Sequence, residues 1–254
     1  MLTATKPATI APDVPPPAAA QFDALKQPGA RCSNCATRNV CMPAGLTHAE
    51  FRRLDALICT MRHVKRGDAL FRAQDPFTSL YAVRTGSFKT IVMHRDGHEQ
   101  VTGFQITGET LGLDGLGDGE HHSDAIALED STVCVIPFAQ LEAACREMRP
   151  LQQHLHQLLS GEIVRESRAM MLLGTMTAEQ RVASFLLNLS ARFKARGYSP
   201  AEFNLRMTRE EIGCYLGMTL ETVSRMLSKF QRSGMIDSRG RQIRITDAQR
   251  LVQV

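Results

Sequence analysis

Hydrophobic residues recur at helical intervals near both ends of the chain and fall into short β-like runs between them. The first helical segment covers residues 46–58, where Thr47 and Glu50 have the spacing of a capping box. Its apolar positions repeat with helical spacing: Leu46, Phe51, Leu54, Leu57 and Ile58. This pattern predicts one short amphipathic helix.

Between about residues 64 and 136 the chain consists of short runs such as SLYAVRTG, SFKTIVMH, EQVTGFQIT and STVCVIPF, separated by glycines. Strands that repeat about every 8 to 12 residues with glycine turns are typical of an antiparallel sandwich or roll. We therefore expect an α+β protein whose N-terminal part is an antiparallel, jelly-roll-like β-roll.

A long helical stretch follows, from about residue 138 to 173, with a narrow apolar stripe on one face. The stripe consists of Leu151, Leu155, Leu159, Ile163, Met170 and Leu173. A stripe this narrow favours pairing with a second copy of the helix, and packing on the chain's own β-roll is the alternative. In the paired form, Leu155, Leu159, Ile163 and Met170 form the interface. Glu166, in the gap of the stripe, places like charges across it and opposes association.

Another amphipathic helix is predicted over residues 177–197, with Thr177 as its cap, Gln180 at the third helical position and Gly197 as its end. Nearer the C-terminus, SRGRQIRIT (238–246) resembles a hairpin wing whose arginines could bind DNA phosphates.

The segment between them, MTREEIGCYLGMTLETVSRMLSKFQRSGMI (207–236), carries the most specific local motif. Thr208 and Glu211 form a capping box that opens one short helix, and Thr219 caps a second. Gly213 lets the two helices cross closely, and Gly217 permits the tight turn between them. Two short helices joined in this way predict a helix-turn-helix, whose second helix enters the DNA major groove.

Three side chains near the start of that second helix, Glu221, Ser224 and Arg225, share its exposed face. Arginine can donate two hydrogen bonds to the edge of guanine, and glutamate can accept a hydrogen bond from the amino group of cytosine. Serine can contact a base or a phosphate. The full set of expected DNA contacts is Glu221, Ser224, Arg225, Thr219, Thr208 and Arg209. The alternative is an ordinary helical pair with a solvated, charged face.

Charge supports the DNA-binding prediction. The chain carries a net charge of +4, and residues 196–250 alone hold ten Lys or Arg against six Asp or Glu. A basic C-terminal end suits a polyanionic partner. No nucleophile with a recognisable base, no phosphate loop and no pair of catalytic carboxylates stands out, so we do not expect an enzyme.

With 254 residues, of which 43% are hydrophobic, the composition is that of a soluble globular protein. Residues 1–30, rich in Pro and Ala, predict a flexible tail and lack the apolar stretch of a signal peptide. No run is long enough for a membrane span, so we expect a cytoplasmic protein without a membrane partner. In a reducing compartment the seven cysteines indicate metal or redox chemistry rather than disulfides.

Cys32, Cys35 and Cys41 have the spacing C-x2-C-x5-C, which suits three ligands of one metal centre. A fourth ligand has to come from Cys59, Cys134, Cys145 or Cys214; the last of these lies in the helix-turn-helix, where packing is its expected role. Four thiolates suit an iron-sulfur cluster or tetrahedral zinc, and the spacing alone does not separate the two.

A β-roll, a long helix and a C-terminal winged helix-turn-helix, in that order, resemble the cyclic-AMP receptor protein superfamily of bacterial transcription regulators. Within it, ETVSR, SGEI, EQVTGF and the N-terminal cysteines resemble the FNR branch, the fumarate and nitrate reduction regulators that sense oxygen. The resemblance runs from residue 32 to about residue 245.

The resemblance implies that Cys134 is the fourth ligand. Cys32, Cys35, Cys41 and Cys134 are then expected to hold one [4Fe-4S] cluster per subunit, with zinc as the alternative. It also implies a contact of RNA polymerase with a surface loop of the roll. The hairpin tip HRDGH offers Arg95, Asp96, Gly97 and His98 for that contact.

Cyclic-nucleotide binders of this superfamily use a Glu for the ribose and an Arg-Ser pair for the phosphate. Glu109 is present here, but His122 and Ser123 stand where the pair is expected. Without the arginine a buried phosphate lacks its bidentate partner, so no cyclic nucleotide is expected. His121 and His122 leave a haem or metal site in a related sensor as a further alternative.

These patterns divide the chain into a tail (1–30), a cluster-binding arm (31–45), a sensor β-roll (46–137), a dimerisation helix (138–174) and a winged helix-turn-helix domain (175–254). The function expected from the resemblance is oxygen-responsive transcription regulation of anaerobic genes. An intact cluster favours a homodimer that binds a palindromic double-stranded operator. The alternative is a regulator of the same fold with structural zinc, haem or another small molecule as its input.

Overall fold

Two short helical turns form the cysteine arm, η1 (Cys32–Asn34) and α1 (Arg38–Cys41), and α2 (His48–Leu57) follows them. The capping box of Thr47 and Glu50 is present at the start of α2, as predicted. The computed structural model describes residues 31–58, 60–94 and 96–254. The tail predicted for residues 1–30, and also Cys59 and Arg95, lie outside the described residues.

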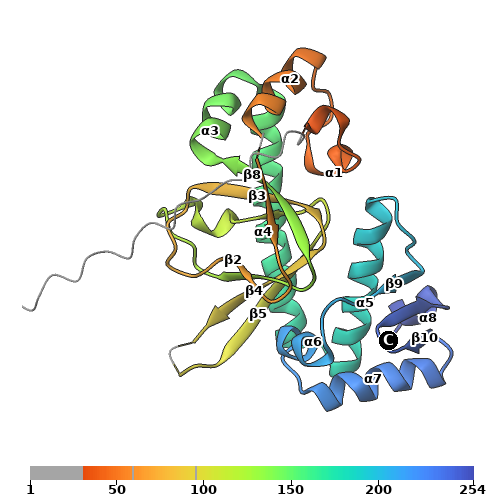
Figure 1. The fold of residues 1–254 in the computed structure, drawn as a ribbon. Helices are drawn as coiled ribbons and strands as arrows, with labels where there is room; N and C mark the ends of the chain where they lie inside the picture. Colours follow the sequence, from red (N-terminus) through yellow and green to blue (C-terminus); the bar gives the residue numbers. More distant parts are fainter. Residues whose placement is uncertain (1–30, 59, 95) are drawn as a thin grey trace, which may run out of the picture.

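The expected β-roll consists of two antiparallel four-stranded sheets that face each other (Figure 1). One has the order β1 (Thr60–Val64), β8 (Ser131–Pro137), β3 (Ser79–Thr85), β6 (Thr110–Leu111). The other has the order β2 (Ala69–Phe71), β7 (Asp124–Ala127), β4 (Ser87–Met93), β5 (Glu99–Ile106), and the turn η2 (Leu113–Leu116) follows β6. Side chains such as Phe88 and Val133, both fully buried, fill the space between the sheets.

The single helix predicted over residues 138–173 is wrong in one respect, because the structure divides it into α3 (Phe138–Glu147) and α4 (Arg149–Thr175). Met148, with φ −116° and ψ 93°, is extended and separates the two. Pro150 explains the break: it lacks an N–H, and its ring would clash with the preceding turn of a continuous helix. It is tolerated in the first turn of α4, where no partner for the N–H is needed.

The apolar stripe of α4 changes role along its length. Leu151 is buried against α2 and α3, and Leu155 packs on the same cluster. Farther along, Ile163 and Met170 are 65% and 68% exposed. The alternative of packing on the chain's own β-roll therefore holds for the first two turns, whereas Ile163 and Met170 are mostly uncovered within the described chain.

The C-terminal part contains α5 (Ala178–Ala195), β9 (Glu202–Asn204), α6 (Arg209–Leu216), α7 (Leu220–Arg232), β10 (Ile236–Arg239), β11 (Gln242–Ile245) and α8 (Ala248–Val252). The predicted wing is the β10–β11 hairpin, and β9 extends it to a three-stranded sheet. Fully buried Phe230, Ile212 and Ile243 belong to the core of this domain. Among the helices of the described ranges, none is long and apolar enough to cross a membrane.

Candidate DNA-binding surface and metal centre

The helix-turn-helix is built by short-range interactions that follow the predicted pattern. Thr208 and Glu211 close a capping box at α6, and the Thr219 hydroxyl accepts the N–H of Thr222 at the start of α7. Gly217, with φ +63°, ends α6 in the left-handed conformation that glycine adopts without strain. A Cβ on Gly213 would lie 2.5 Å from the Met218 carbonyl oxygen, so glycine is required where the two helices cross.

The predicted reading face of α7 is open to solvent. Glu221 and Arg225 are exposed and Ser224 is half-buried. Arg225 donates from Nη2 to the Thr222 hydroxyl, 3.1 Å away, which holds its guanidinium beside the N-terminal turn. The helix N-terminus and the Thr219 hydroxyl lower the pKa of Glu221, and Arg225 adds to this effect. An ionised glutamate and an arginine thus lie together on the face that is predicted to read base edges.

The two candidates on α6 have more structural roles than expected. Thr208 is exposed but uses its hydroxyl for the cap. Arg209 is half-buried, and it donates from Nη2 to the Gly240 carbonyl in the wing, 2.9 Å away. Burial and the neighbouring Arg241 lower the pKa of its guanidinium. Arg209 therefore fixes the wing against α6 besides standing near the expected DNA surface.

The four candidate metal ligands gather at one end of the β-roll, although Cys134 lies 93 residues after Cys41. Cys32 is buried in the hydrophobic cluster formed by α2, α3 and the start of α4, and Cys41 and Cys134 pack against the same cluster. Cys134 sits in the middle of β8, paired with Met61 on one side and Ala82 on the other. The fold thus brings the arm to β8.

Burial raises the pKa of Cys32 to about 12, and the nearby thiols of Cys41, Cys134 and Cys35 add to the increase. Burial likewise raises the pKa of Cys41 to about 11, followed by the effect of Cys35. Desolvation and mutual repulsion both disfavour thiolates. As neutral thiols these groups are compatible with the apolar cluster, and a bound cation would have to displace their protons.

The four sulfur atoms are close enough to influence one another but are not arranged as ligands. Within the described residues, no group of three or more His, Cys, Asp or Glu side chains is set to hold a metal ion. The Cys35 sulfur lies 3.1 Å from the Thr37 hydroxyl, and Cys41 donates to the Thr37 carbonyl at 3.3 Å. Four unpaired thiols at one end of the roll are nevertheless the donor set that an iron-sulfur cluster or zinc requires.

The two other cysteines in the described part of the chain are used for packing. Cys145 is buried in α3. Cys214 lies where α6 meets β5: its sulfur accepts the N–H of Val101 and donates to the Glu99 carbonyl, both at 3.2 Å. The packing role predicted for Cys214 agrees with these contacts.

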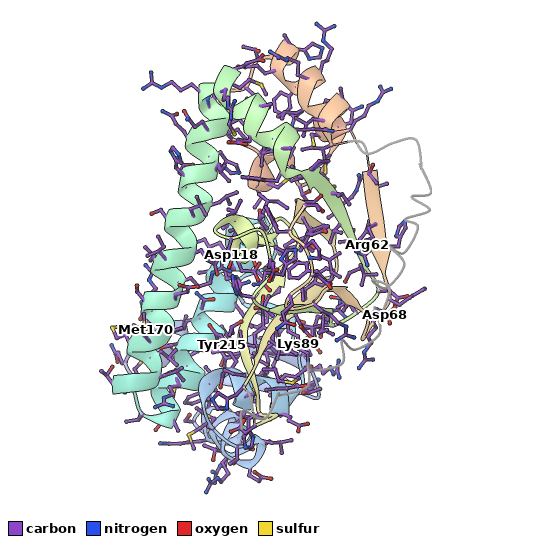
Figure 2. The ribbon with its side chains drawn as sticks, turned by 90° about the vertical axis from the view of Figure 1, so that its left-hand side faces the viewer. Arg62, Asp68, Lys89, Asp118, Met170 and Tyr215 are labelled. Atoms are coloured by element: carbon purple, nitrogen blue, oxygen red, sulfur yellow. The ribbon has the colours of Figure 1, made fainter. Side chains whose placement is uncertain are left out.

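The candidate dimer residues divide along α4 into a half-buried pair and an exposed group. Leu155 packs on the chain's own core and Leu159 lines a cavity of about 630 Å³ between α4 and the roll. Glu166, Ile163 and Met170 are exposed and line the same cavity, and Figure 2 labels Met170 on α4. The like charge of Glu166 contributes, after burial, to the raised pKa of Glu162. The exposed apolar side chains Ile163 and Met170 and the carboxylate of Glu166 therefore lie on the same exposed part of α4.

The groups that correspond to a cyclic-nucleotide site are engaged by the protein itself. Asp114, which the sequence did not single out, accepts the N–H of His122 at 3.0 Å and both the N–H and the hydroxyl of Ser123. Its other oxygen lies 3.2 Å from Nδ1 of the buried His121. Glu109 is bound by Arg192 of α5 and by Arg196, the residue that follows α5. No local sequence pattern predicts these hydrogen bonds and ion pairs, because each one forms between segments that meet only in the folded chain.

The hairpin tip predicted to meet RNA polymerase connects β4 and β5, as expected, and Gly97 has φ +86° in its turn. Asp96 accepts the N–H of His98 at 3.1 Å. Val92 and Met93, which lead into the tip, are 41% and 61% exposed.

A β-roll joined by a long helix to a winged helix-turn-helix with an open reading face defines a DNA-binding transcription regulator. The comparisons agree with this class. A family model described as a Crp-like helix-turn-helix domain matches residues 180–254, and one described as a cyclic nucleotide-binding domain matches residues 61–148.

The chain is 45% identical over 230 residues to the transcriptional regulatory protein btr of Bordetella pertussis, covering 91% of this chain and 95% of that protein. It is 43% identical over 223 residues to the fumarate and nitrate reduction regulatory protein of Escherichia coli K12, covering 88% and 89%. The solved structure of FixK2 from Bradyrhizobium japonicum matches with a TM-score of 0.71 and 32% identity, over 76% of this chain and 96% of that one.

The chain therefore belongs to the Crp/FNR family of transcription regulators. The predicted fold and the predicted family resemblance are confirmed, and the relatives are regulators rather than enzymes.

Proposed function

We propose that this protein regulates transcription in response to oxygen through a [4Fe-4S] cluster held by Cys32, Cys35, Cys41 and Cys134. The observation that carries the proposal is the meeting of these thiols, from two distant segments, against one apolar cluster. The regulators named for fumarate and nitrate reduction among its relatives support the same interpretation. When bound, the cluster would supply an oxygen-labile tie between the arm and β8.

The arm is placed where it can affect α4. Cys32 and Met42 of the arm share a cluster with Leu151, in the first turn of α4, and Leu155 packs against the same cluster. A tie between Cys41 and Cys134 would hold the arm on this cluster, and its loss would loosen the packing at the start of α4. The residues of the arm thereby influence the helix that carries the exposed stripe.

We also propose that the exposed stripe pairs two copies of the chain along α4. Ile163 and Met170 would bury most of their exposed surface in such a pair, and each buried side chain of this size contributes roughly 1.5 to 3 kcal/mol. The Glu166 carboxylates would then approach each other and keep the association weak enough to be switched. The two α7 helices of the pair would read half-sites about 34 Å apart, so the operator would be a near palindrome.

The input is proposed not to be a cyclic nucleotide. The carboxylate of Asp114 already accepts hydrogen bonds from the donors of His122 and Ser123 that a phosphate would need, and Arg192 and Arg196 bind Glu109. The hairpin tip at Asp96, Gly97 and His98 is proposed to contact RNA polymerase, since it projects from the roll with exposed apolar residues at its base.

Anaerobic purification tests the proposal. We expect a brown protein with about four iron and four sulfide ions per subunit. On exposure to air it should bleach and lose its affinity for a palindromic operator, measured by fluorescence anisotropy. A colourless protein that holds one zinc ion per subunit, with operator binding unaffected by air, would contradict the proposal and favour structural zinc.

A further inference from the structure

The carboxylate of Glu109, in the loop between β5 and β6, is buried and bound on both oxygens. Arg192 donates from Nε and Arg196 from Nη2 to Oε1, at 2.9 and 2.8 Å, and the N–H of Ile106 donates to Oε2 at 2.9 Å. The three side chains are 12%, 20% and 11% exposed for Glu109, Arg192 and Arg196. Burial alone would raise the pKa of Glu109, but the two arginines outweigh it and hold the pKa below its usual value.

These arginines belong to the DNA-binding domain, whereas Glu109 belongs to the β-roll. They lie one helical turn apart at the end of α5, and both also bind the backbone of the roll. Arg192 donates to the Phe104 carbonyl, and Arg196 donates from Nε to the Thr107 carbonyl at 2.7 Å. We call Glu109, Arg192 and Arg196 the interdomain clamp. Because both guanidinium groups are largely buried, removing the carboxylate would leave two unpaired charges and weaken the contact strongly.

Aromatic packing continues the same domain boundary beside the clamp. Phe104 of β5 contacts Phe185 of α5 and Tyr215 of α6, with ring centroids 6.0 and 5.3 Å apart. Figure 2 labels Tyr215 and Lys89 in this region, and Lys89 pairs with Glu211 at 2.7 Å. The clamp therefore fixes one face of the DNA-binding domain on the roll in a defined orientation.

The cysteine arm touches the loop that the clamp holds. Gly108 lies between Val40, the neighbour of Cys41, and Arg196. A Cβ on Gly108 would lie 3.0 Å from Cγ1 of Val40 and 3.5 Å from Nε of Arg196. In Figure 1, α1 is accordingly seen near the end of α5 where Arg196 follows. The arm, the loop and the DNA-binding domain thus meet at one point.

The clamp sets the direction in which α7 points relative to α4, on which operator binding by a pair of copies depends. In Figure 1, α7 lies at the end of the molecule opposite the cysteine arm, and α5 runs between the two. Two copies paired along α4 can read a palindromic operator only if their α7 helices face the same side of the pair. A DNA-binding domain free to rotate on the roll would lose this arrangement.

We propose that Arg192 and Arg196 are positioning residues for operator binding, which hold the DNA-binding domain through Glu109, and that Val40 couples the cysteine arm to this clamp within one subunit. The clamp does not depend on a metal centre. Only the proposed role of Val40 in transmitting the oxygen signal rests on the proposed function. The coupling differs from pairing along α4, since it needs no second chain.

Glu109→Gln tests the clamp, because it keeps the shape of the side chain and removes its charge. We expect the full-length variant to load metal and dimerise like the wild type but to bind a palindromic operator about tenfold more weakly, within the 5- to 150-fold range usual for coupled sites. Glu129→Gln is the matched control, since Glu129 pairs with Arg206 across the same boundary in a more exposed setting. We expect it to change affinity less than twofold.

Val40→Ala tests the coupling through a double-mutant cycle. Val40→Ala alone should weaken operator binding a few-fold, and adding it to Glu109→Gln should cause no further loss, because both act on one loop. Operator affinity of Glu109→Gln equal to that of the wild type would overturn the clamp, and additive effects would overturn the role of Val40. If Glu109→Gln fails to fold, Arg192→Lys keeps the charge but loses the fork, and unchanged affinity in that folded variant would equally overturn the clamp.

The cluster content of every sample, measured by absorption, separates these outcomes from those of the proposed function. A wild-type protein without iron would contradict the iron-sulfur proposal. The ratio of operator affinities between the wild type and Glu109→Gln would still show whether the clamp supports operator binding.

Discussion

The DNA-binding domain and the cysteine arm differ in how far apart their essential residues lie in the sequence. In the domain, the caps Thr208 and Thr219 and the turn glycine Gly217 lie within 12 positions of one another. In the arm, Cys41 and its proposed co-ligand Cys134 lie 93 positions apart, and burial followed by neighbouring thiols raises the pKa of Cys32 and Cys41. The helix-turn-helix is thus specified by residues close together in the sequence, whereas the cysteine arm depends on long-range packing.

The largest effect should follow from opening the core of the DNA-binding domain. Leu227 is 4% exposed in α7, and Leu227→Ala should destabilise this domain by about 2 to 5 kcal/mol by leaving a cavity. Calorimetry of the full chain should show this loss, while anaerobic metal uptake by the arm stays normal. Leu220→Ala, at a position 43% exposed in the same helix, should cost less than about 0.5 kcal/mol. Loss of metal uptake in Leu227→Ala would show that the two regions are not separable.

Next in size is the loss of a reading side chain. Arg225→Ala should weaken operator binding by about 1 to 3 kcal/mol and relax base preference at one position, because arginine binds guanine with two hydrogen bonds. Anisotropy titrations against single-base operator variants measure both effects. Arg232→Ala, an exposed residue at the far end of α7, should reduce affinity without changing the base preference. An unchanged preference in Arg225→Ala would remove Arg225 from the reading face.

A smaller effect is expected at the start of α6. Thr208→Ala removes the hydroxyl that accepts the N–H of Glu211 at 3.1 Å, and it should destabilise the DNA-binding domain by about 1 kcal/mol. Thr208→Ser keeps the cap and should restore most of the stability in thermal unfolding. If serine fails to restore it, the contribution of Thr208 is not the cap.

The smallest effect is expected on α4. Glu166→Ala removes the like charges that would face each other in a pair, which typically cost about 0.2 to 0.5 kcal/mol per pair. Analytical ultracentrifugation in air should show a modest increase in dimer, together with stronger operator binding. Glu142→Ala, an exposed acid on α3, is the control and should leave the monomer-dimer equilibrium unchanged. Equal behaviour of the two variants would exclude Glu166 from the interface.

The parts of the fold that the sequence predicted are those set by neighbours in the chain. The capping boxes at Thr47, Thr177 and Thr208 follow from residues three positions apart. The break at Met148 had a visible signal in Pro150, which the regular stripe obscured. Strand β9, three residues long, is too short for a period to be recognised.

The candidate site was predictable only in part for the same reason. Its three arm cysteines are defined by their spacing, but Cys134 was selected by family resemblance rather than by any local pattern. The contact of Asp114 with Ser123 and the clamp of Glu109 with Arg192 exist only after the chain has folded, since the clamp joins residues 83 positions apart. The partners of buried charges and polar groups such as these are set by tertiary packing. Helix propensity and hydrophobic periodicity carry no information about them.

The most direct test of the account compares Cys134→Ser with Cys145→Ser through a cycle from anaerobic conditions to air. Both thiols belong to the same hydrophobic region, but only Cys134 is a proposed ligand. We predict that Cys145→Ser is brown and binds the operator until air is admitted. Cys134→Ser should be colourless, and its weak operator binding should be the same with and without oxygen. Operator binding by Cys134→Ser that still responds to oxygen would contradict the account.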